Sequence, residues 1–97
     1  MTALFGTLPR FPLGQVVITP GALAALEAMH QTPYAFLSRH AQGDWGDLCD
    51  ADCQENARAL QGGFRLFSSY ALGDGQRLWI ITEADRSATT LLLPLEY

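Results

Sequence analysis

The sequence predicts an α+β fold, in which a short N-terminal strand and three helices precede a three-stranded antiparallel meander, with the helices packed on one of its faces. Two Thr-Pro pairs, at 19–20 and 32–33, have the composition of helix starts, with threonine as the N-cap and proline in the first turn. The segment 64–72 has the alternation of a strand, with Phe64, Leu66, Ser68, Tyr70 and Leu72 on one face and Arg65, Phe67, Ser69 and Ala71 on the other. The Gly-Asp-Gly-Gln sequence at 73–76 is typical of a hairpin turn. We expect one domain that spans residues 1–97.

The composition favours a globular protein. Hydrophobic residues make up 48% of the chain and charged residues 16%, which is too apolar for disorder. No apolar run reaches the roughly eighteen residues that span a bilayer, and residues 1–12 lack the basic start and apolar stretch of a signal peptide. We therefore expect a cytoplasmic protein that makes no membrane contact.

The charge balance is acidic. The formal net charge is -4, and all six basic residues are arginines. This balance disfavours extensive contact with nucleic acid, but it is compatible with a small phosphate site built from two arginines. It fits a basic protein partner and equally fits simple solubility.

The first half of the chain is expected to be mostly helical. A β-branched run at 16–18 indicates a first strand, and the two Thr-Pro pairs begin helices that extend to about residues 30 and 42. Helical spacing places Leu23 and Leu26 on the inward side of the first helix.

A third helix is expected to begin with Asp47 or Asp50 as its N-cap and to end near residue 61, before two glycines. Helical spacing predicts that its inward face consists of Cys49, Cys53, Ala57 and Leu60. Strands are expected at 77–84 and 89–93. If the last strand is an unpaired, leucine-rich edge, it could drive homodimerisation.

A candidate site arises from the expected strand register. A hairpin about 74–75 places Arg65 opposite the 83–85 end of the next strand, and a second turn about 86–87 places Thr89 opposite Ala84. The residues that would then converge are Arg65, Glu83, Asp85, Arg86, Ser87 and Thr89. Two arginines with carboxylates and hydroxyls could bind a phosphate, with Glu83 as a base. Alternatively, Asp85 and Ser87 build the turn while the arginines pair with the acids.

His40 is the other candidate acid or base. It follows Phe36 by four residues and Leu37 by three, so it borders the apolar stripe of the second helix. A lone histidine in this position is either a proton-transfer group or a structural hydrogen-bonding residue.

The turn at 43–47 combines two glycines, two acids and a tryptophan. Asp44 and Asp47 flank Trp45 within a wider acidic segment, whose spacing does not match a calcium-binding loop. An exposed Trp45 would be a binding hot spot for a basic protein surface. The alternative is that Trp45 folds onto the core.

No cofactor or metal is expected. Cys49 and Cys53 form one pair without a second Cys or His pair at zinc spacing. Nucleotide-binding loops, the serine-hydrolase elbow and the zinc-protease motif are missing from the sequence.

Three stretches resemble a family of short bacterial proteins from plasmids and other mobile elements, which carry names such as plasmid-related protein. They are HxxGDWGD at 40–47, LWIITEADRS at 78–87 and LLLPLEY at 91–97. The resemblance covers nearly the whole chain. It implies a mobile-element context and no particular activity.

A second resemblance is to RelE-like ribonuclease toxins. It is carried by Gly-Phe-Arg-Leu at 63–66, the hairpin that follows, and Arg86 after the third strand. In that family, helices precede an antiparallel sheet whose arginines or lysines grip and cleave RNA, and Arg65 and Arg86 match by position. The acidic charge and the missing lysines depart from that pattern.

Together these observations favour a small non-enzymatic interaction or regulatory protein of a mobile element. It would act through the acidic Trp45 turn or the arginine end of the sheet, on a protein partner such as a host defence or nucleic-acid enzyme. The alternative is a RelE-like or barnase-like ribonuclease that uses Arg65 and Arg86 on the phosphate, with Glu83 or His40 for proton transfer. RNA is a partner only under this alternative.

Overall fold

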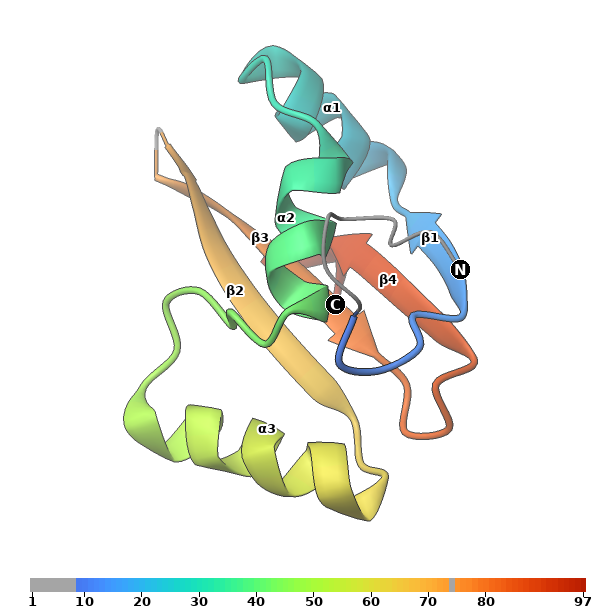
Figure 1. Cartoon of the computed structure of the whole chain (residues 1–97). Coiled ribbons are helices and arrows are strands. Elements are labelled where there is room, and N and C mark those ends of the chain that lie inside the picture. The colour runs from blue at the N-terminus through green and yellow to red at the C-terminus, as the bar shows by residue number, and fades with distance from the viewer. Residues whose placement is uncertain (1–8, 74) are drawn as a thin grey trace.

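The computed structural model describes residues 9–73 and 75–97, and it has the predicted order of one strand, three helices and three strands (Figure 1). The tip of the first hairpin was expected at Asp74, which lies outside the described residues, as does part of the N-terminal segment. The elements are β1 (Gln15–Ile18), α1 (Pro20–Ala28), α2 (Pro33–Ala41), α3 (Asp50–Gly62), β2 (Leu66–Gly73), β3 (Gln76–Thr82), β4 (Ala88–Leu92) and the 3₁₀ helix η1 (Pro94–Glu96). The α+β fold class is therefore confirmed.

The four strands form one mixed sheet in the order β1-β4-β3-β2. β1 pairs in parallel with β4, from Gln15 opposite Ala88 to Ile18 opposite Leu91. The condition for dimerisation through an unpaired last strand is not met, because β4 lies between β1 and β3. A parallel pair needs a long crossover, and everything from α1 to β3 separates these two strands in the sequence.

The strand register matches the expectation at one hairpin and departs from it at the other. Leu66 lies opposite Thr82, which brings Arg65 beside Glu83 as predicted. Thr89, however, lies opposite Thr82 and not opposite Ala84. The loop spans 84–87 and is closed by the hydrogen bond from Glu83 N to Ala88 O, with Arg86 in the left-handed region at a φ of 62°.

The Thr-Pro pairs begin both helices, but the two threonines differ. Thr19 Oγ1 accepts a hydrogen bond from Ala22 N over 3.1 Å, whereas Thr32 makes no side-chain cap bond. α1 ends at Ala28, two residues earlier than expected. Its buried residues are Ala22, Ala25 and Leu26. The expectation that Leu23 faces inward is wrong, since this side chain remains 40% exposed.

The expected inward face of α3 is wrong for two of its four residues, because Cys49 and Ala57 are exposed, whereas Cys53 is partly buried and Leu60 packs against the core. Cys49 is the N-cap in place of an aspartate, and the fully buried residues of the helix are Asn56 and Ala59. The reason is the position of the helix beside the outer edge of β2, which pairs with the Trp45 turn at Ser69 and with the helix at Phe67. There the Asn56 amide accepts a hydrogen bond from Phe67 N over 3.1 Å and donates one to Phe67 O over 2.7 Å.

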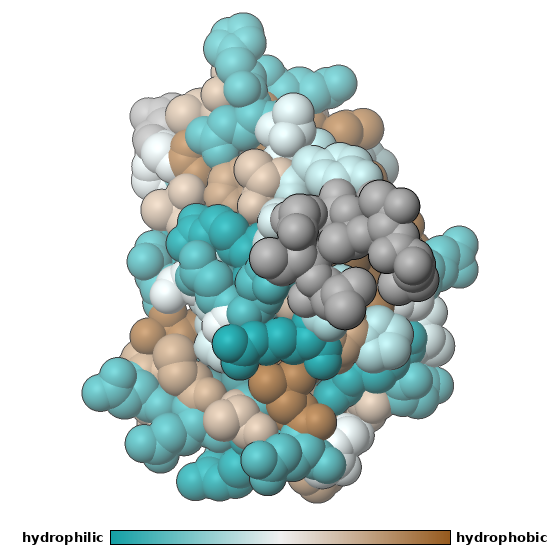
Figure 2. Space-filling view, viewed as in Figure 1, coloured by the Kyte–Doolittle hydropathy of each residue, from teal (hydrophilic) through white to brown (hydrophobic). Residues whose placement is uncertain are grey.

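The main core lies between α1, α2 and one face of the sheet. It consists of Ala22, Ala25, Leu26, Phe36, Leu37, Tyr70, Leu72, Leu78, Ile80 and Leu91. Figure 2 shows the outside of this helical layer as hydrophilic residues interrupted by small, separate hydrophobic areas. Of the helices in the described part of the chain, none is long and apolar enough to cross a membrane.

Candidate functional site

His40 lies inside the molecule. Its side chain is 0% exposed, and it sits between two aromatic rings that meet the imidazole nearly at right angles. The centroid of Phe11 is 5.3 Å from that of His40, and the centroid of Trp45 is 5.5 Å away. These rings and the sheet separate the imidazole from solvent.

A chain of hydroxyls fixes the tautomer of His40. The Leu13 carbonyl can only accept, so Thr89 Oγ1 donates to it over 2.7 Å. Thr89 Oγ1 then accepts from Thr82 Oγ1 over 2.8 Å, and Thr82 Oγ1 accepts from Nε2 of His40 over 2.9 Å. On the other side of the ring, Ser68 Oγ donates to Nδ1 over 2.5 Å. The hydroxyl chain that starts at the Leu13 carbonyl therefore places the proton of the ring on Nε2.

Burial lowers the pKa of His40 to about 3, because the charged imidazolium would lose its hydration without gaining a carboxylate partner. The neutral ring therefore works as a hydrogen-bonding link between α2, β2 and β3. This placement matches the structural interpretation of His40. Thr89 belongs to the same buried network and does not reach the surface with the other predicted site residues.

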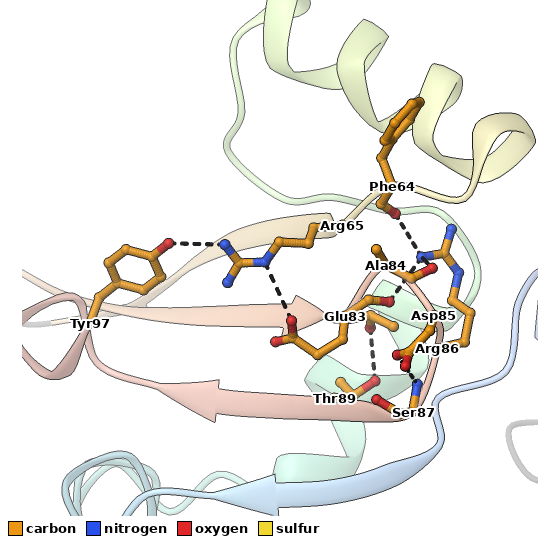
Figure 3. Close-up of polar contacts among 10 residues, drawn as sticks. Phe64, Arg65, Glu83, Ala84, Asp85, Arg86, Ser87, Thr89 and Tyr97 are labelled. Atoms are coloured by element: carbon orange, nitrogen blue, oxygen red, sulfur yellow. Dashed lines mark hydrogen bonds and ion pairs between the residues drawn. The ribbon is translucent and has the colours of Figure 1, made fainter.

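Arg86 is held by backbone oxygens. Its left-handed backbone turns the side chain back under the loop, and its guanidinium lies 5.9 Å from the centroid of the Phe11 ring. The guanidinium donates to the carbonyls of Phe64, Glu83 and Ala84 at 2.6–3.1 Å (Figure 3). It also donates to the carbonyl of Ala59 over 2.9 Å. Arg86 thus ties the C-terminal end of α3 to the β3–β4 loop.

Asp85 and Ser87 form the loop itself. Asp85 Oδ1 accepts a hydrogen bond from Ser87 N over 2.9 Å, and the hydrogen bonds from Ser87 lower the pKa of this carboxyl. This is the geometry of an Asx turn. Both residues have the contacts expected from the turn-building interpretation.

Of the two arginines predicted for the site, Arg65 is the accessible one. Its side chain is 49% exposed and lies between Glu83 and Tyr97 (Figure 3). Nη1 donates to the Tyr97 hydroxyl over 3.1 Å, whereas Nε is 3.7 Å from Glu83 Oε1, which is longer than a hydrogen bond. The structure therefore brings Arg65 and Glu83 together at the surface and places Arg86 and Thr89 elsewhere.

The acidic Trp45 turn is tied to the fold through arginines. Asp44 pairs with Arg39 over 2.7 Å, and this contact lowers the pKa of the Asp44 carboxyl. Asp47 pairs with Arg77 over 3.1 Å. Trp45 is partly buried and packs beside Phe11, so the tryptophan folds onto the core.

The opposite side of the sheet from α1 and α2, which we call the open face, carries a second group of aromatic residues. Phe67 and Trp79 meet edge to face with centroids 5.1 Å apart, and Tyr97 meets Trp79 at 5.8 Å. These rings border a shallow pocket of about 270 Å³, which we call the Trp79 pocket. It is lined by Arg65, Leu66, Phe67, Trp79, Ile81 and Tyr97.

The segment that carries Tyr97 is anchored at the start of α1. The Glu96 carboxylate accepts hydrogen bonds from Thr19 Oγ1 over 2.5 Å and from Leu93 N over 2.8 Å. These bonds lower the pKa of Glu96. They hold η1 so that Leu95 is fully exposed and Tyr97 reaches Trp79.

Sequence reasoning missed Phe67, Trp79 and Tyr97 as candidate site residues. The strand alternation places Phe67 on the same face as Arg65. This was the one sequence feature that could have indicated aromatic residues on the outer face of the sheet. The position of Trp79 on the same side follows from its register opposite Ser69. Nothing local in the sequence predicts that Tyr97 returns to this face.

The described residues contain no group of three or more His, Cys, Asp or Glu side chains that could hold a metal ion. Comparisons of the chain with known protein families, with functionally described proteins and with solved structures find no significant match.

Proposed function

We propose that this chain is a non-enzymatic binding protein of a mobile genetic element, and that its partner docks on the open face around Trp79. The mobile-element context comes from the family resemblance alone. The partner would be a host protein such as a defence or nucleic-acid enzyme. The observation that carries the docking surface is the Trp79 pocket, where three aromatic rings and Arg65 meet at the surface.

The character of this surface supports binding. Aromatic and arginine side chains are the residues most enriched in binding hot spots. Tyr97, which borders the pocket, is 69% exposed, and Val17, which lies on the same face of the sheet, is 42% exposed. A monomer that leaves large apolar side chains together on one face gains by covering them with a partner.

The surroundings of His40 and Arg86 favour binding over catalysis. A proton-transfer group must reach its substrate within hydrogen-bond distance, but His40 is enclosed and its nitrogens are both bonded to hydroxyls. An arginine that grips phosphate needs free donors, but Arg86 directs its two terminal nitrogens at backbone carbonyls. Arg65 alone offers a weaker basis for cleavage.

Site-specific photo-crosslinking in bacteria that carry the element tests the proposal. A photoreactive phenylalanine analogue replaces Ala71 or Val17, which lie on the open face, and Ala28 or Ala57 as exposed controls on α1 and α3. We expect one protein adduct from the two open-face positions and none from the controls.

Two results would contradict the proposal. One is an adduct pattern that is the same from the sheet and from the helices. The other is RNA cleavage by the purified protein that disappears in a folded Arg65→Ala variant, which would favour the ribonuclease alternative.

A further inference from the structure

The chemistry of the Trp79 pocket indicates what kind of group it takes. Its lining is mainly apolar and includes Ile81 and the rings of Phe67 and Trp79. Both aromatic contacts around Trp79 are edge to face, with interplanar angles of 83° and 71°. A further ring that packs against this cluster would gain the same favourable geometry.

Among the described residues that line this pocket, Arg65 is the charged one. Among the described residues, its guanidinium makes one hydrogen bond, to Tyr97, and a longer ionic contact to Glu83. A guanidinium has five N–H donors. Arg65 therefore keeps donors for an anionic group at the mouth of an aromatic pocket.

Tyr97 shows how such a group sits. The Tyr97 ring lies against Trp79, and its hydroxyl accepts a hydrogen bond from Arg65. The guanidinium of Arg65 is 5.8 Å from the centroid of the Tyr97 ring. Yet Tyr97 is 69% exposed, so most of its surface makes no contact. A neutral phenol is also a weaker acceptor for a guanidinium than a carboxylate.

We infer that the Trp79 pocket binds an aromatic side chain followed by a carboxylate on a partner protein, and that Tyr97 is an internal occupant which the partner displaces. This inference rests on the proposed function and adds the chemistry of the partner. The ring replaces Tyr97 against Trp79, and the carboxylate takes the donors of Arg65 in a charge-assisted pair. Glu96, bound at the start of α1, keeps the rest of η1 in place while Tyr97 swings away.

The charges around the pocket favour a protein over a single-stranded nucleic acid. Arg65 stands beside Glu83, and Arg77 pairs with Asp47. The chain carries a net charge of -4, so a polyanion that follows the sheet would meet acidic groups beside both arginines. A partner protein that places a single carboxylate at Arg65 avoids the repulsion that a polyanion would meet.

The test is a titration followed by ¹H–¹⁵N correlation spectra of the full chain. Of the two indole N–H signals, Trp79 reports the pocket, and Trp45, which packs beside Phe11 and His40, is the internal control. The probes are acetyl-Gly-Phe-Asp-Gly-amide, the same peptide with Asn for Asp, the same peptide with Ala for Phe, and octauridylate.

We expect the Phe-Asp peptide to shift the Trp79 signal saturably and leave Trp45 unchanged. The Asn peptide should bind about fivefold more weakly, because it lacks the charge-assisted pair. The Ala peptide should not shift Trp79. Tyr97→Ala should tighten binding of the Phe-Asp peptide about threefold, since no internal occupant has to leave.

Two arginine variants give the matched control. Arg65→Gln should bring the Phe-Asp peptide down to the affinity of the Asn peptide. Arg58→Gln should leave the affinity unchanged, because Arg58 is an exposed, ion-paired arginine on α3. Equal weakening by both variants would mean that only general electrostatics is involved, and would overturn the role of Arg65.

Each of the remaining outcomes supports or overturns a part of the inference. A Tyr97→Ala variant that binds no better, or more weakly, overturns the displacement of Tyr97. Saturable shifts with octauridylate and none with the peptides overturn the protein partner in favour of RNA. If no probe shifts Trp79 while crosslinks still form from the open face, this inference fails and the proposed function stands. If those crosslinks are also missing, the proposed function fails.

Discussion

Nη1 of Arg65 donates a hydrogen bond to the hydroxyl of Tyr97 over 3.1 Å, although the two residues are 32 positions apart. This contact brings the residue before β2 to the residue after η1, across the outer side of β3. The two side chains and Trp79 make one surface cluster. Of the predicted arginine site, the accessible part is therefore an aromatic pocket edge and not a pair of phosphate-gripping arginines.

His40 should make the stability of the protein pH-dependent. Its pKa is about 3 in the folded state, below the value of roughly 6.5 expected when it is unfolded. Between these two pKa values the imidazole is protonated in the unfolded state but not in the folded state. The free energy of unfolding therefore falls as the pH is lowered from 6.5 towards 3. The slope from this residue reaches about 1.4 kcal/mol per pH unit, and the contribution is intact above pH 6.5.

Urea unfolding at a series of pH values, with His40→Gln as the comparison, checks this prediction. The carboxylates titrate in both proteins, so the difference between the two slopes isolates His40. Identical slopes between pH 6.5 and 4 would contradict a buried, neutral His40.

The hydroxyl of Thr82 should contribute more to stability than the hydroxyl of Thr90 on β4, which lies opposite Ile81. Thr82→Val removes the acceptor for Nε2 of His40 and leaves this buried N–H unsatisfied, which costs about 2 kcal/mol. Thr90→Val makes the same chemical substitution at a threonine on the open face, and we expect the free energy of unfolding to change by no more than about 0.5 kcal/mol. Chemical denaturation compares the two variants, and equal losses would contradict the hydroxyl chain.

Arg86 should act through its backbone as well as through its guanidinium. Arg86→Ala and Arg86→Gly both remove the contacts to the carbonyls. Alanine should be less stable than glycine by about 1 kcal/mol, because only glycine tolerates a φ of 62° without strain. Thermal unfolding measures the order of the two variants. An alanine variant as stable as the glycine variant would contradict the left-handed loop.

Asn56 should protect the edge of β2. Asn56→Ala removes both hydrogen bonds to the backbone of Phe67, and we expect a loss of about 2–3 kcal/mol. It also frees a strand edge that can pair with another copy, so light scattering should detect more self-association. Gln54→Ala, at an exposed position on the same helix, should change neither quantity. A neutral Asn56→Ala variant would contradict the edge contact.

Local chemistry accounts for the parts of the fold that were predicted. The Thr-Pro pairs fix the helix starts, and the alternation at 64–72 fixes which side chains of β2 share a face. Leu66, Ser68, Tyr70 and Leu72 are all buried, as one face of this alternation requires. Such signals need no knowledge of distant residues.

The misses arise where distant contacts decide. Hydrophobicity ranks Cys53 above Asn56 as an inward residue of α3, but the neighbour of α3 is a strand edge, which needs an amide more than an apolar group. The pairing of β1 with β4 depends on the whole crossover between them. The register of Thr89 depends on a left-handed Arg86, which sequence reasoning could not anticipate because a non-glycine residue rarely adopts it.

The candidate site was half predicted for the same reason. Register arithmetic correctly placed Arg65 beside Glu83, since it needed one hairpin only. The arrival of Tyr97 depends on the anchoring of Glu96 at Thr19, a contact between residues 77 positions apart. A pocket whose lining depends on such a distant anchor leaves no local pattern in the sequence.

The central claim is that the open face around Trp79 is the binding surface. The most direct test is the yield of partner adduct from the photoreactive group at position 71 when Trp79 is substituted. The variants Trp79→Ala and the milder Trp79→Leu are compared with Leu23→Ala, which changes an exposed apolar residue on α1. Circular dichroism first shows that each variant is folded. We predict that both Trp79 variants reduce the partner adduct at least about tenfold and that Leu23→Ala leaves it unchanged. An adduct that persists at full yield in the folded Trp79 variants would contradict the account.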